Sequence, residues 1–261
     1  MLCSLPMYPY PPAQLDALWL ALRKNLHRAG LDNLPTQLTL PDDYQQHWQD
    51  PHLLLSQSCG FPAVNLLAEQ VGIIGAFHYD IPGCKEYHYS SQLLVRRDDP
   101  RQHLADFHGG IAMCSEPHSQ SGYHALRSHI ARRALAQPFF GSVMFSGGHR
   151  HSARRLAAGE ADIAALDSVS LHLLAQQEAQ VFSRLRILEQ TAFTPGLPLI
   201  THHATDDAVV TSLRTGLSAL FADPETAHLL QVMRISNFTA LDGSAYQNLK
   251  LAVGMQPALV F

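Results

Sequence analysis

The chain is poor in charged residues and has no long apolar run, and each shortage excludes a class of protein. Charged residues make up 15% of the 261 residues and the net charge is −4, so the composition indicates neither nucleic acid nor an acidic membrane as a partner. No apolar run reaches the length of a membrane-spanning helix. With 46% hydrophobic residues, the sequence can still bury sizeable cores, and its length suits one large domain or two lobes of ordinary size.

The N-terminal segment, MLCSLPMYPYPPAQLDALW, lacks the pattern of an export signal. It has no basic stretch followed by a long apolar stretch. It predicts instead a short strand, a proline-rich turn and an amphipathic helix. The sequence as given therefore leaves two expectations open, namely a chain that stays in the cytoplasm or one whose leader is missing.

Cysteine is scarce, and its spacing argues against a zinc-ribbon site. The four cysteines contain no CxxC pair. Cys3 and Cys114 lie in predicted strands and are expected in the core. Cys59 and Cys84 lie in the turn-like stretches SQSCGFP and DIPGCKEY. The sequence leaves open whether these two form a disulfide bond or remain thiols.

The sixteen histidines are an unusual number, and two groups of them suggest a metal site. The first is HRH at 149–151 and the second is HH at 202–203. Alternate residues in a loop rarely converge on one ion, and no cysteine or carboxylate stands near the first group in sequence. We therefore predict no metal and no other cofactor.

Strand-like and helix-like segments alternate along most of the chain. This order predicts an α/β fold with a mostly parallel sheet and helices on both faces. The predicted strands are 2–7, 53–57, 71–79, 90–98, 110–115, 142–147, 161–167, 185–192 and a last one ending at 203. The predicted helices are 13–30, 64–70, 101–107, 123–134, 151–159, 170–177, 206–221, 225–233 and 244–255.

Two extended segments, 93–98 and 192–200, bracket a block of about a hundred residues. A block that is entered and left by extended segments suggests two lobes joined by paired hinge strands. We therefore predict that residues 1–96 and 199–261 form the first lobe and residues 97–198 the second. The ligand cleft is expected between them.

Polar residues gather where predicted strands of the middle block give way to helices, and ligands of open α/β sheets bind at such junctions. In SEPHSQSGY, Ser119, Ser121 and Gly122 precede a helix whose apolar face begins at Tyr123. Unpaired backbone N–H groups, a partial positive charge and serine hydroxyls at a helix start can hold an oxyanion without lysine. A serine N-cap followed by chance polar residues would give the same pattern.

Two further junctions carry a histidine and an aspartate. His149 follows Gly147 and Gly148 at a helix start, where it either donates to an anion or is an exposed loop residue. Asp167 ends the apolar strand ADIAALD, where its carboxylate is an N-cap, a ligand contact or both. Ser121, His149 and Asp167 also have the residue types of a hydrolase triad, although no G-x-S-x-G elbow is present.

Taken together, three segments resemble the phosphonate-binding-protein-like family of ABC-transporter substrate-binding proteins. They are SQSGYHALR, GGHRHSARRLAAGEADIAALDSV and RILEQTAFTPGLPLIT. The earlier pieces SLPMYPYP, LLLSQSCGFPA and GCKEYHYSSQLLVRRDD look like the first lobe of that family, so the resemblance covers nearly the whole chain. It implies the type 2 periplasmic-binding-protein fold, with two Rossmann-like lobes whose sheets are mixed and mostly parallel.

The resemblance also implies the ligand contacts. In the family, a Ser-Thr-Ser-Gly-like turn holds the phosphorus oxygens, and a histidine follows a Gly-Ser or Gly-Gly pair. An aspartate lies near the end of the next strand, and aromatic residues of the first lobe commonly line the cleft. The matching residues here are Ser119, Gln120, Ser121, Gly122, His149, Asp167, Tyr8 and Tyr79. Gln120 departs from the family pattern, because it replaces the usual small hydroxyl residue.

The function implied by the resemblance is capture of a phosphonate, phosphate or phosphite for an ABC permease in the periplasm. The chain would act as a monomer, without enzyme activity or cofactor. Two alternatives stand beside it. One is a cytoplasmic ligand sensor with the same fold, and the other is a serine hydrolase that uses Ser121, His149 and Asp167.

Overall fold

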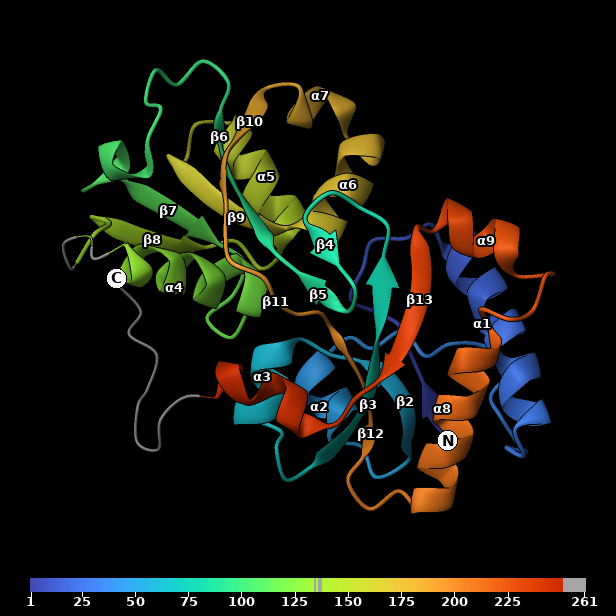
Figure 1. The fold of residues 1–261 in the computed structure, drawn as a ribbon. Coiled ribbons are helices and arrows are strands. Elements are labelled where there is room, and N and C mark those ends of the chain that lie inside the picture. The colour runs from blue at the N-terminus through green and yellow to red at the C-terminus, as the bar shows by residue number, and fades with distance from the viewer. Residues whose placement is uncertain (134, 136–137, 251–261) are drawn as a thin grey trace. The chain divides into compact units, whose positions relative to one another are not determined.

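The structure is a computed structural model that describes residues 1–133, 135 and 138–250 (Figure 1). This part of the chain forms two compact units. Unit 1 consists of Met1–Asp80, Lys85–His88 and Pro195–Lys250. Unit 2 holds the described residues of Ile81–Cys84 and Tyr89–Thr194. Within the described residues, no helix combines the length and apolar character needed to cross a membrane.

Unit 1 is built on a five-stranded sheet in the order β1-β2-β12-β3-β13. Its strands are β1 (Leu2–Cys3), β2 (Leu53–Gln57), β3 (Val71–Tyr79), β12 (Pro198–His202) and β13 (Ile235–Ala240). Its helices are α1 (Pro12–Arg28), α2 (Tyr44–Trp48), α3 (Gly60–Asn65), α8 (Asp207–Ala219), α9 (Ala227–Val232) and the 3-10 helix η3 (Gly243–Leu249). Figure 1 shows α1, α8 and α9 on one face of this sheet and α2, α3 and η3 on the other.

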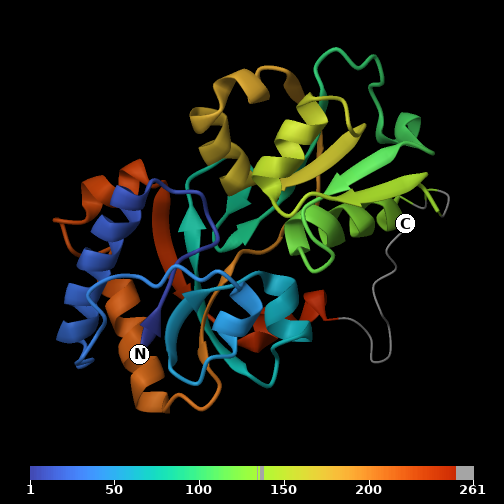
Figure 2. The same ribbon diagram turned by 180° about the vertical axis from the view of Figure 1, so that it is seen from behind.

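Unit 2 is built on a second five-stranded sheet in the order β10-β6-β9-β7-β8. Its strands are β6 (Ser91–Arg96), β7 (Ile111–Cys114), β8 (Ser142–Phe145), β9 (Ile163–Asp167) and β10 (Leu185–Gln190). Its helices are the 3-10 helix η1 (Leu104–Phe107), the π-helical turn η2 (Gln120–His124), α4 (Ala125–Arg132), α5 (His149–Ala157), α6 (Ser168–Gln177) and α7 (Ala179–Phe182). Helix α4 covers one face of the sheet and α5 covers the other (Figure 2).

Strand β9 shows why the middle of this sheet is so apolar. Ile163 and Ala165 pack into the core on the α4 side, whereas Ala164 and Leu166 pack into the core on the α5 side. A strand buried on both faces has no polar face to alternate with its apolar one. This two-sided burial explains why the segment ADIAALD is almost entirely apolar.

The predicted α/β fold with two lobes and mixed sheets is confirmed, but the expectation that parallel pairs dominate is wrong. Parallel pairs join β1 to β2, β7 to β8 and β7 to β9, and the other described pairs of these two sheets are antiparallel. The connections explain this. Strand β3 leads out of unit 1 and its neighbour β12 leads back in, while β6 leads into unit 2 and its neighbour β10 leads out. Neighbouring strands that carry the chain in opposite directions pair antiparallel.

The boundary between the units also differs from the predicted one. The chain leaves unit 1 within residues 80–89, and it returns between Thr194 and Pro195. The prediction placed the first crossing at 93–98, yet β6 at that place is hydrogen-bonded to β10 and β9 inside the sheet of unit 2. The return falls inside the predicted segment 192–200. The strands that accompany the crossings, in the order β11-β5-β4, are β11 (Thr194–Pro195), β5 (His88–Tyr89) and β4 (Cys84–Lys85).

Strand β13 is the largest element that the sequence pattern does not reveal. A register shift between Ile235 and Asn237 interrupts its pairing with β3. The buried residues Ile235 and Phe238 are therefore three positions apart, and the strict alternation of a strand is lost. The short helices α2 and α7 are likewise absent from the predicted elements.

Three predicted helices differ in place or type. The helix expected at 101–107 is the shorter 3-10 helix η1. The helix expected at 64–70 is α3, which lies earlier, with Pro62 in the first turn where a missing N–H is tolerated. The helix expected at 244–255 is the 3-10 helix η3, and its predicted residues beyond Lys250 lie outside the described residues. Ala134, the predicted end of the serine-led helix, also lies outside them.

The two cysteines that were predicted to lie in the core are buried. Cys3 and Cys114 are buried in β1 and β7, as predicted. Cys59 belongs to unit 1 and Cys84 to unit 2, and the structure contains no bond between them. The pairing that the sequence left open is therefore not part of this structure.

Candidate functional site

Three parallel strands of unit 2 end at the same edge of its sheet, and each is followed by a polar segment that begins a helix. Strand β7 leads to Ser115 and Ser119, β8 leads to His149, and β9 ends at Asp167. The register fixes this edge, because Cys114 of β7 lies beside the last residue of β8. The three junctions singled out in the sequence thus meet at the carboxyl edge of one sheet.

Ser119 caps the helix that follows β7. Its Oγ accepts a hydrogen bond from the backbone N–H of Gly122 at 2.9 Å. The π-helical turn η2 then continues into α4, whose predicted apolar face is buried at Tyr123, Leu126 and Ile130. Ser119 is therefore an N-cap, as the sequence pattern allowed, and Ser121 lies within the first turn after the cap.

A glycine is required at position 122 because the side chains of Ser115 and Ser119 lie close to its backbone. A Cβ at this position would lie 2.3 Å from Ser115 Oγ and 3.0 Å from Ser119 Oγ. From the other side, Ser91 Oγ donates to the carbonyl oxygen of Ser121 at 2.9 Å. Only glycine lets the turn lie this close to Ser115.

His149 is held inward by both of its ring nitrogens. Nδ1 lies 3.0 Å from Ser115 Oγ, and Nε2 lies 2.9 Å from Ser121 Oγ. The side chain is 16% exposed. Gly147, at φ +85°, makes the turn that precedes it, and its N–H donates to the carbonyl oxygen of Ser115 at 2.8 Å. The interpretation of His149 as an exposed loop residue is therefore wrong.

Asp167 joins this cluster from the end of β9. Its Oδ1 accepts from the N–H of Ser170 at 2.7 Å, which confirms its predicted role as N-cap of α6. Its Oδ2 lies 3.0 Å from His149 Nε2, and its side chain is 4% exposed. Burial by itself would raise the pKa of Asp167, but the hydrogen bonds and charge of His149, together with the bonds from Ser170, hold that pKa below its usual range. The carboxylate is therefore ionised at neutral pH.

The order of contacts differs from that of a catalytic triad. In a triad, the serine and the aspartate lie on opposite nitrogens of the histidine ring. Here Ser121 and Asp167 share Nε2, while Ser115 occupies Nδ1. The three residue types of a hydrolase therefore come together, but with the serine and the aspartate on one ring nitrogen instead of on opposite nitrogens.

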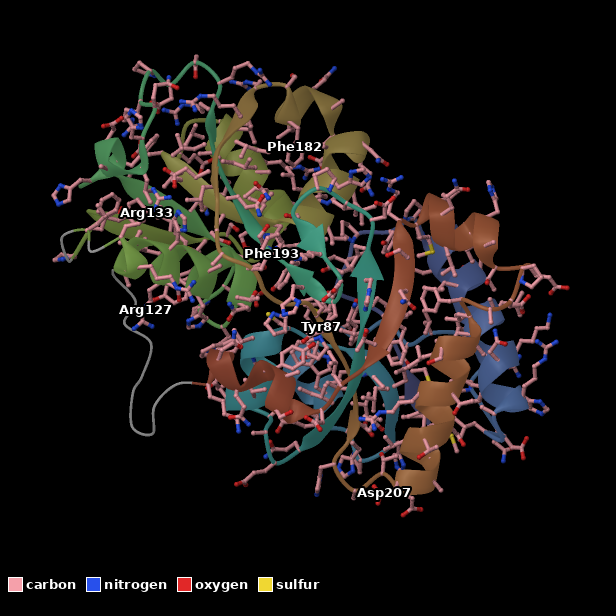
Figure 3. All side chains as sticks on the ribbon, viewed as in Figure 1. Tyr87, Arg127, Arg133, Phe182, Phe193 and Asp207 are labelled. Carbon is pink, nitrogen blue, oxygen red and sulfur yellow. The ribbon has the colours of Figure 1, made fainter. Side chains whose placement is uncertain are left out.

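The described contacts of these side chains are made by hydroxyl, imidazole, carboxylate and backbone groups. Arg133, labelled in Figure 3, has its partner on another strand of the sheet. Arg133, at the end of α4, forms an ion pair of 2.7 Å with Glu189 on β10. His129 of α4 contacts the same carboxylate at 3.0 Å. These groups tie α4 to the sheet.

Ser115 and Ser168 contact the candidate site, although the sequence pattern did not single them out. Ser115 opens the segment SEPHSQSGY, but its pairing with His149 spans 34 residues and has no local signal. Ser168 follows Asp167, donates to the carbonyl oxygen of Ser90 at 2.9 Å, and accepts from Gln92 at 3.0 Å. Ser90, Gln92 and Ser168 thus form a buried polar cluster next to the end of β9.

Cys84 lies close enough to Asp167 for the charge of that carboxylate to affect the pKa of the thiol. Burial, and after it that charge, raises the pKa of the Cys84 thiol to about 12. Gly83, at φ +90°, packs so tightly that a Cβ there would lie 2.1 Å from Ser168 Oγ. The thiol is therefore neutral at pH 7 and adds no second negative charge beside Asp167.

The two aromatic candidates lie in unit 1 and are in contact with each other. The rings of Tyr8 and Tyr79 are 5.3 Å apart in an edge-to-face arrangement. Tyr8 follows β1 and Tyr79 ends β3, and these two strands run in the same direction within their sheet. Both side chains therefore lie at one edge of that sheet. Their contact with a ligand stays a prediction.

The histidine groups at 149–151 and 202–203 do not form a metal site in the described part of the chain. No three or more histidine, cysteine, aspartate or glutamate side chains there converge as ligands of one ion. His149 is instead occupied by two serines and an aspartate.

Solved structures with this architecture include binding proteins for phosphorus compounds. The binding-protein component of an ABC phosphonate transporter from Pseudomonas aeruginosa has a TM-score of 0.74 and 17% identity, over 94% of this chain and 83% of that one. PhnD1 from Prochlorococcus marinus, in complex with methylphosphonate, has a TM-score of 0.74 and 12% identity, over 95% of both chains. A Xanthomonas citri protein bound to ATP has a TM-score of 0.70 and 18% identity, over 95% of this chain and 98% of that one.

At these identities, the structures establish the fold alone, and no curated protein matches the chain in sequence. The family is established by the sequence itself. Residues 7–246 match the family described as the periplasmic substrate-binding protein of the phosphonate ABC transporter. The match spans both units and every junction described above, and the chain belongs to this family of ABC-transporter substrate-binding proteins.

Proposed function

We propose that the carboxyl edge of the unit 2 sheet holds the oxygens of a small phosphorus oxyanion, namely a phosphonate, phosphate or phosphite. The observation that carries this proposal is the convergence of Ser121 Oγ and His149 Nε2, 2.9 Å apart, at a helix start capped by Ser119. The first turn of a helix also presents backbone N–H groups without an intrahelical partner, although the N–H of Gly122 is not among them because it donates to Ser119. Methylphosphonate, the ligand of the Prochlorococcus protein, is of this chemical class.

Useful affinity requires several hydrogen-bond donors around the oxyanion. Micromolar binding requires about −8 kcal/mol. A hydrogen bond to a charged group contributes roughly 1.5–3 kcal/mol. Four or five such donors around one oxyanion reach that value and leave a surplus against the lost freedom of the ligand.

Asp167 is proposed to select among anions. An ionised, buried carboxylate beside an oxyanion is repulsive unless a proton or a cation lies between them. A phosphonate or phosphate monoanion carries an acidic O–H, and a ligand amine could serve in its place. Sulfate carries no proton at neutral pH and is therefore expected to be rejected.

Calorimetric titration tests the proposal directly. The full chain is titrated with methylphosphonate, inorganic phosphate and phosphite at pH 7.5 and constant ionic strength. We expect micromolar or tighter binding of at least one of them, and a Ser121→Ala variant that binds it more weakly. Absence of binding to all three would show that the site serves another ligand.

The family operates in the periplasm with an ABC permease. We propose the same compartment and partner for this chain, acting as a monomer. Sensing is the second candidate, because a histidine kinase sensor domain shares the architecture with a TM-score of 0.61 and 13% identity over 93% of this chain. Neighbouring genes for a permease and an ATPase favour transport, whereas a neighbouring kinase gene favours sensing.

We further propose that the chain is a binding protein without hydrolase activity. The support is the shared nitrogen, which leaves Ser121 without the free basic nitrogen that activates a catalytic serine. A fluorophosphonate probe for reactive serines tests this. Labelling that is lost in Ser121→Ala would reverse the proposal.

A further inference from the structure

We infer that Asp167 is a positioning residue that fixes the tautomer of His149 and thereby keeps the hydroxyl proton of Ser121 available to the ligand. This inference deepens the proposed function, and its second half rests on that function. It concerns a hydrogen atom whose place follows from the surrounding heavy atoms.

The first step is the state of Asp167. Its Oδ1 is committed to the backbone N–H of Ser170 at 2.7 Å, and its Oδ2 faces His149 Nε2 at 3.0 Å. An ionised carboxylate only accepts hydrogen bonds. Nε2 of His149 must therefore carry a hydrogen and donate it to Asp167.

The second step concerns Nδ1, which lies 3.0 Å from Ser115 Oγ. A hydroxyl can either donate or accept. A neutral His149 accepts from Ser115 at Nδ1, and a protonated His149 donates to it. Nε2 carries a hydrogen in both cases, so the tautomer does not depend on the charge of the ring.

The third step concerns Ser121, whose Oγ lies 2.9 Å from the same Nε2. A nitrogen that carries a hydrogen has no lone pair to accept the serine proton. The hydroxyl hydrogen of Ser121 must point elsewhere, and an oxyanion at the helix start is the acceptor that suits it. Asp167 thus makes Ser121 a donor, which is the reverse of the role that a triad aspartate gives its serine.

An asparagine at position 167 breaks this arrangement in a defined way. Its amide offers one oxygen and one NH₂ group. The N–H of Ser170 belongs to the backbone and requires the oxygen, so the NH₂ group must face His149. Nε2 then becomes an acceptor, the hydrogen moves to Nδ1, and Ser121 can donate into the ring instead of to a ligand.

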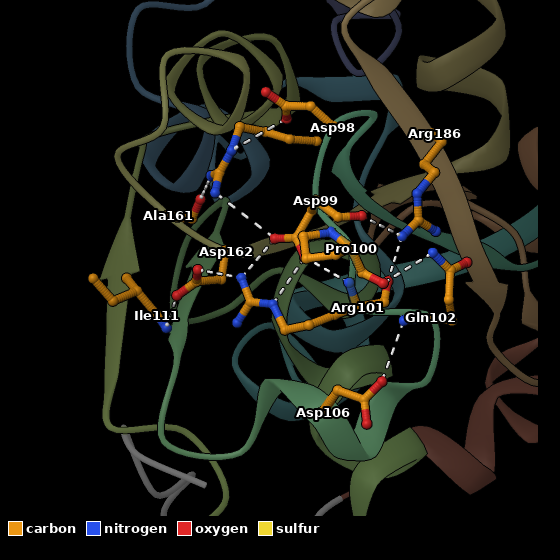
Figure 4. Close-up of polar contacts among 11 residues, drawn as sticks. Asp98, Asp99, Pro100, Arg101, Gln102, Asp106, Ile111, Ala161, Asp162 and Arg186 are labelled. Carbon is orange, nitrogen blue, oxygen red and sulfur yellow. Dashed lines mark hydrogen bonds and ion pairs between the residues drawn. The ribbon is translucent and has the colours of Figure 1, made fainter.

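Asp162, at the other end of β9, is a matched control (Figure 4). Its Oδ2 accepts from the backbone N–H of Ile111 at 2.8 Å, and its Oδ1 accepts from Arg101 at 2.6 Å. The two aspartates therefore have the same kind of partners, one backbone N–H and one side chain. Arginine has no second tautomer to adopt at neutral pH, and so Asp162→Asn removes a charge without touching His149.

The test is the two-bond nitrogen–proton NMR spectrum of the full, ¹⁵N-labelled chain without ligand at pH 7.5. The signals of His149 are assigned by their loss in His149→Gln. We expect a protonated Nε2 in the wild type and in Asp162→Asn, and a protonated Nδ1 in Asp167→Asn. A wild type with the hydrogen on Nδ1 overturns the inference, even if the variant does not fold.

A calorimetric titration of the same proteins with methylphosphonate separates this inference from the proposed function. We expect Asp167→Asn to bind at least tenfold more weakly and Asp162→Asn to bind within about twofold of the wild type. If the wild type has the expected tautomer but binds no phosphorus oxyanion, the proposed function fails and the tautomer assignment stands. If Asp167→Asn shifts the tautomer without weakening binding, the role of Ser121 as the controlled donor is wrong.

Discussion

The two ends of strand β9 carry the same residue type in opposite surroundings. Asp162, just before the strand, meets an arginine, whereas Asp167, at its end, meets a histidine. Arginine keeps its charge and its protons at any ordinary pH, but histidine can change both. The difference indicates that the amino end of the sheet is built to stay unchanged, while the carboxyl end keeps groups that can respond to a ligand.

At the amino end of β9, the carboxylates are paired with arginine side chains, which stay charged (Figure 4). Arg101 Nη2 lies 2.6 Å from an oxygen of Asp99 and 2.6 Å from an oxygen of Asp162. Its guanidinium also stacks 4.1 Å above the ring centre of Phe107. Arg186 donates to the carbonyl oxygen of Asp99 at 3.2 Å. The segment before η1 is thus tied to β9 and β10 by bonds that leave little capacity for a ligand.

Replacing Arg101, at the amino end of β9, should give the largest change in stability. Arg101→Met leaves Asp99, whose side chain is 2% exposed, and Asp162 without their main cation. Breaking a buried pair in this way costs about 3 kcal/mol, so unit 2 should unfold at clearly lower urea concentration. Binding of methylphosphonate should be unchanged at a urea concentration where the variant is folded.

Arg154→Met is the control for this prediction. Arg154 is 52% exposed and pairs with Glu178, so its loss should cost much less stability than the loss of Arg101. Equal costs for the two variants would mean that the Arg101 network stabilises the fold no more than a surface ion pair does.

Removing a hydrogen-bond donor at the carboxyl end of β9 should have the opposite effect, weakening ligand binding while leaving stability nearly unchanged. Ser121→Ala should weaken ligand binding by about 1–3 kcal/mol, roughly 5- to 150-fold, with a change in unfolding free energy below about 1 kcal/mol. Calorimetry and urea denaturation measure the two quantities. Ser183→Ala, which removes an exposed hydroxyl at the end of α7, should change neither. Unchanged affinity in Ser121→Ala would place the oxyanion away from this helix.

Acid should weaken both ends of β9. Hydrogen bonds from Arg101 hold the pKa of Asp99 below its usual value, and Asp162 and Asp167 are lowered as well, despite the burial that would raise them. A lowered pKa in the folded state contributes stability that is fully present above the unfolded value of about 3.9 and is lost as the pH falls through the folded value. These aspartates should therefore make the unfolding free energy fall below about pH 4. The fall should begin earlier, near pH 6.5, because burial lowers the pKa of His124 to about 3 and the unfolded chain takes up a proton that the folded chain does not.

The Arg101→Met variant sharpens this third prediction. Without the arginine, the pKa of Asp99 should move back toward its ordinary value, and the fall in stability with acid should become shallower. Ser121→Ala should keep the wild-type slope, because it leaves the contacts of Arg101 in place. Urea denaturation between pH 3 and pH 7 compares the three proteins, and identical slopes would contradict the role given to Arg101.

The smallest signal is expected from sulfate. The wild type should show no thermal shift with sulfate at neutral pH, at an ionic strength where methylphosphonate gives a clear one. Asp167→Asn should show a slight response to sulfate, because the repelling charge is gone. Affinity for the true ligand should also fall as the pH rises and the ligand loses its last proton, unless the ligand carries an amine. Tight sulfate binding by the wild type would overturn the proposed selectivity.

The sequence by itself determined the features that depend on neighbours along the chain. The apolar face of α4, the two-sided burial of ADIAALD and the caps at Ser119 and Asp167 all follow from spacing within a few residues. Their position at one sheet edge was also predictable, since consecutive parallel strands end on the same side. These signals located most of the candidate site in unit 2.

Only the tertiary structure decided what those residues touch. Strand direction, the first crossing near residue 89 and the bulged strand β13 depend on pairing between distant segments. Ser115 and His149 are 34 residues apart, and no local pattern indicates their contact. The most consequential case is the nitrogen of His149 that Ser121 and Asp167 share. The same three residues could form a relay or a binding site, and the choice rests on which side of one ring each of them meets, a matter of packing that the order of residues does not express.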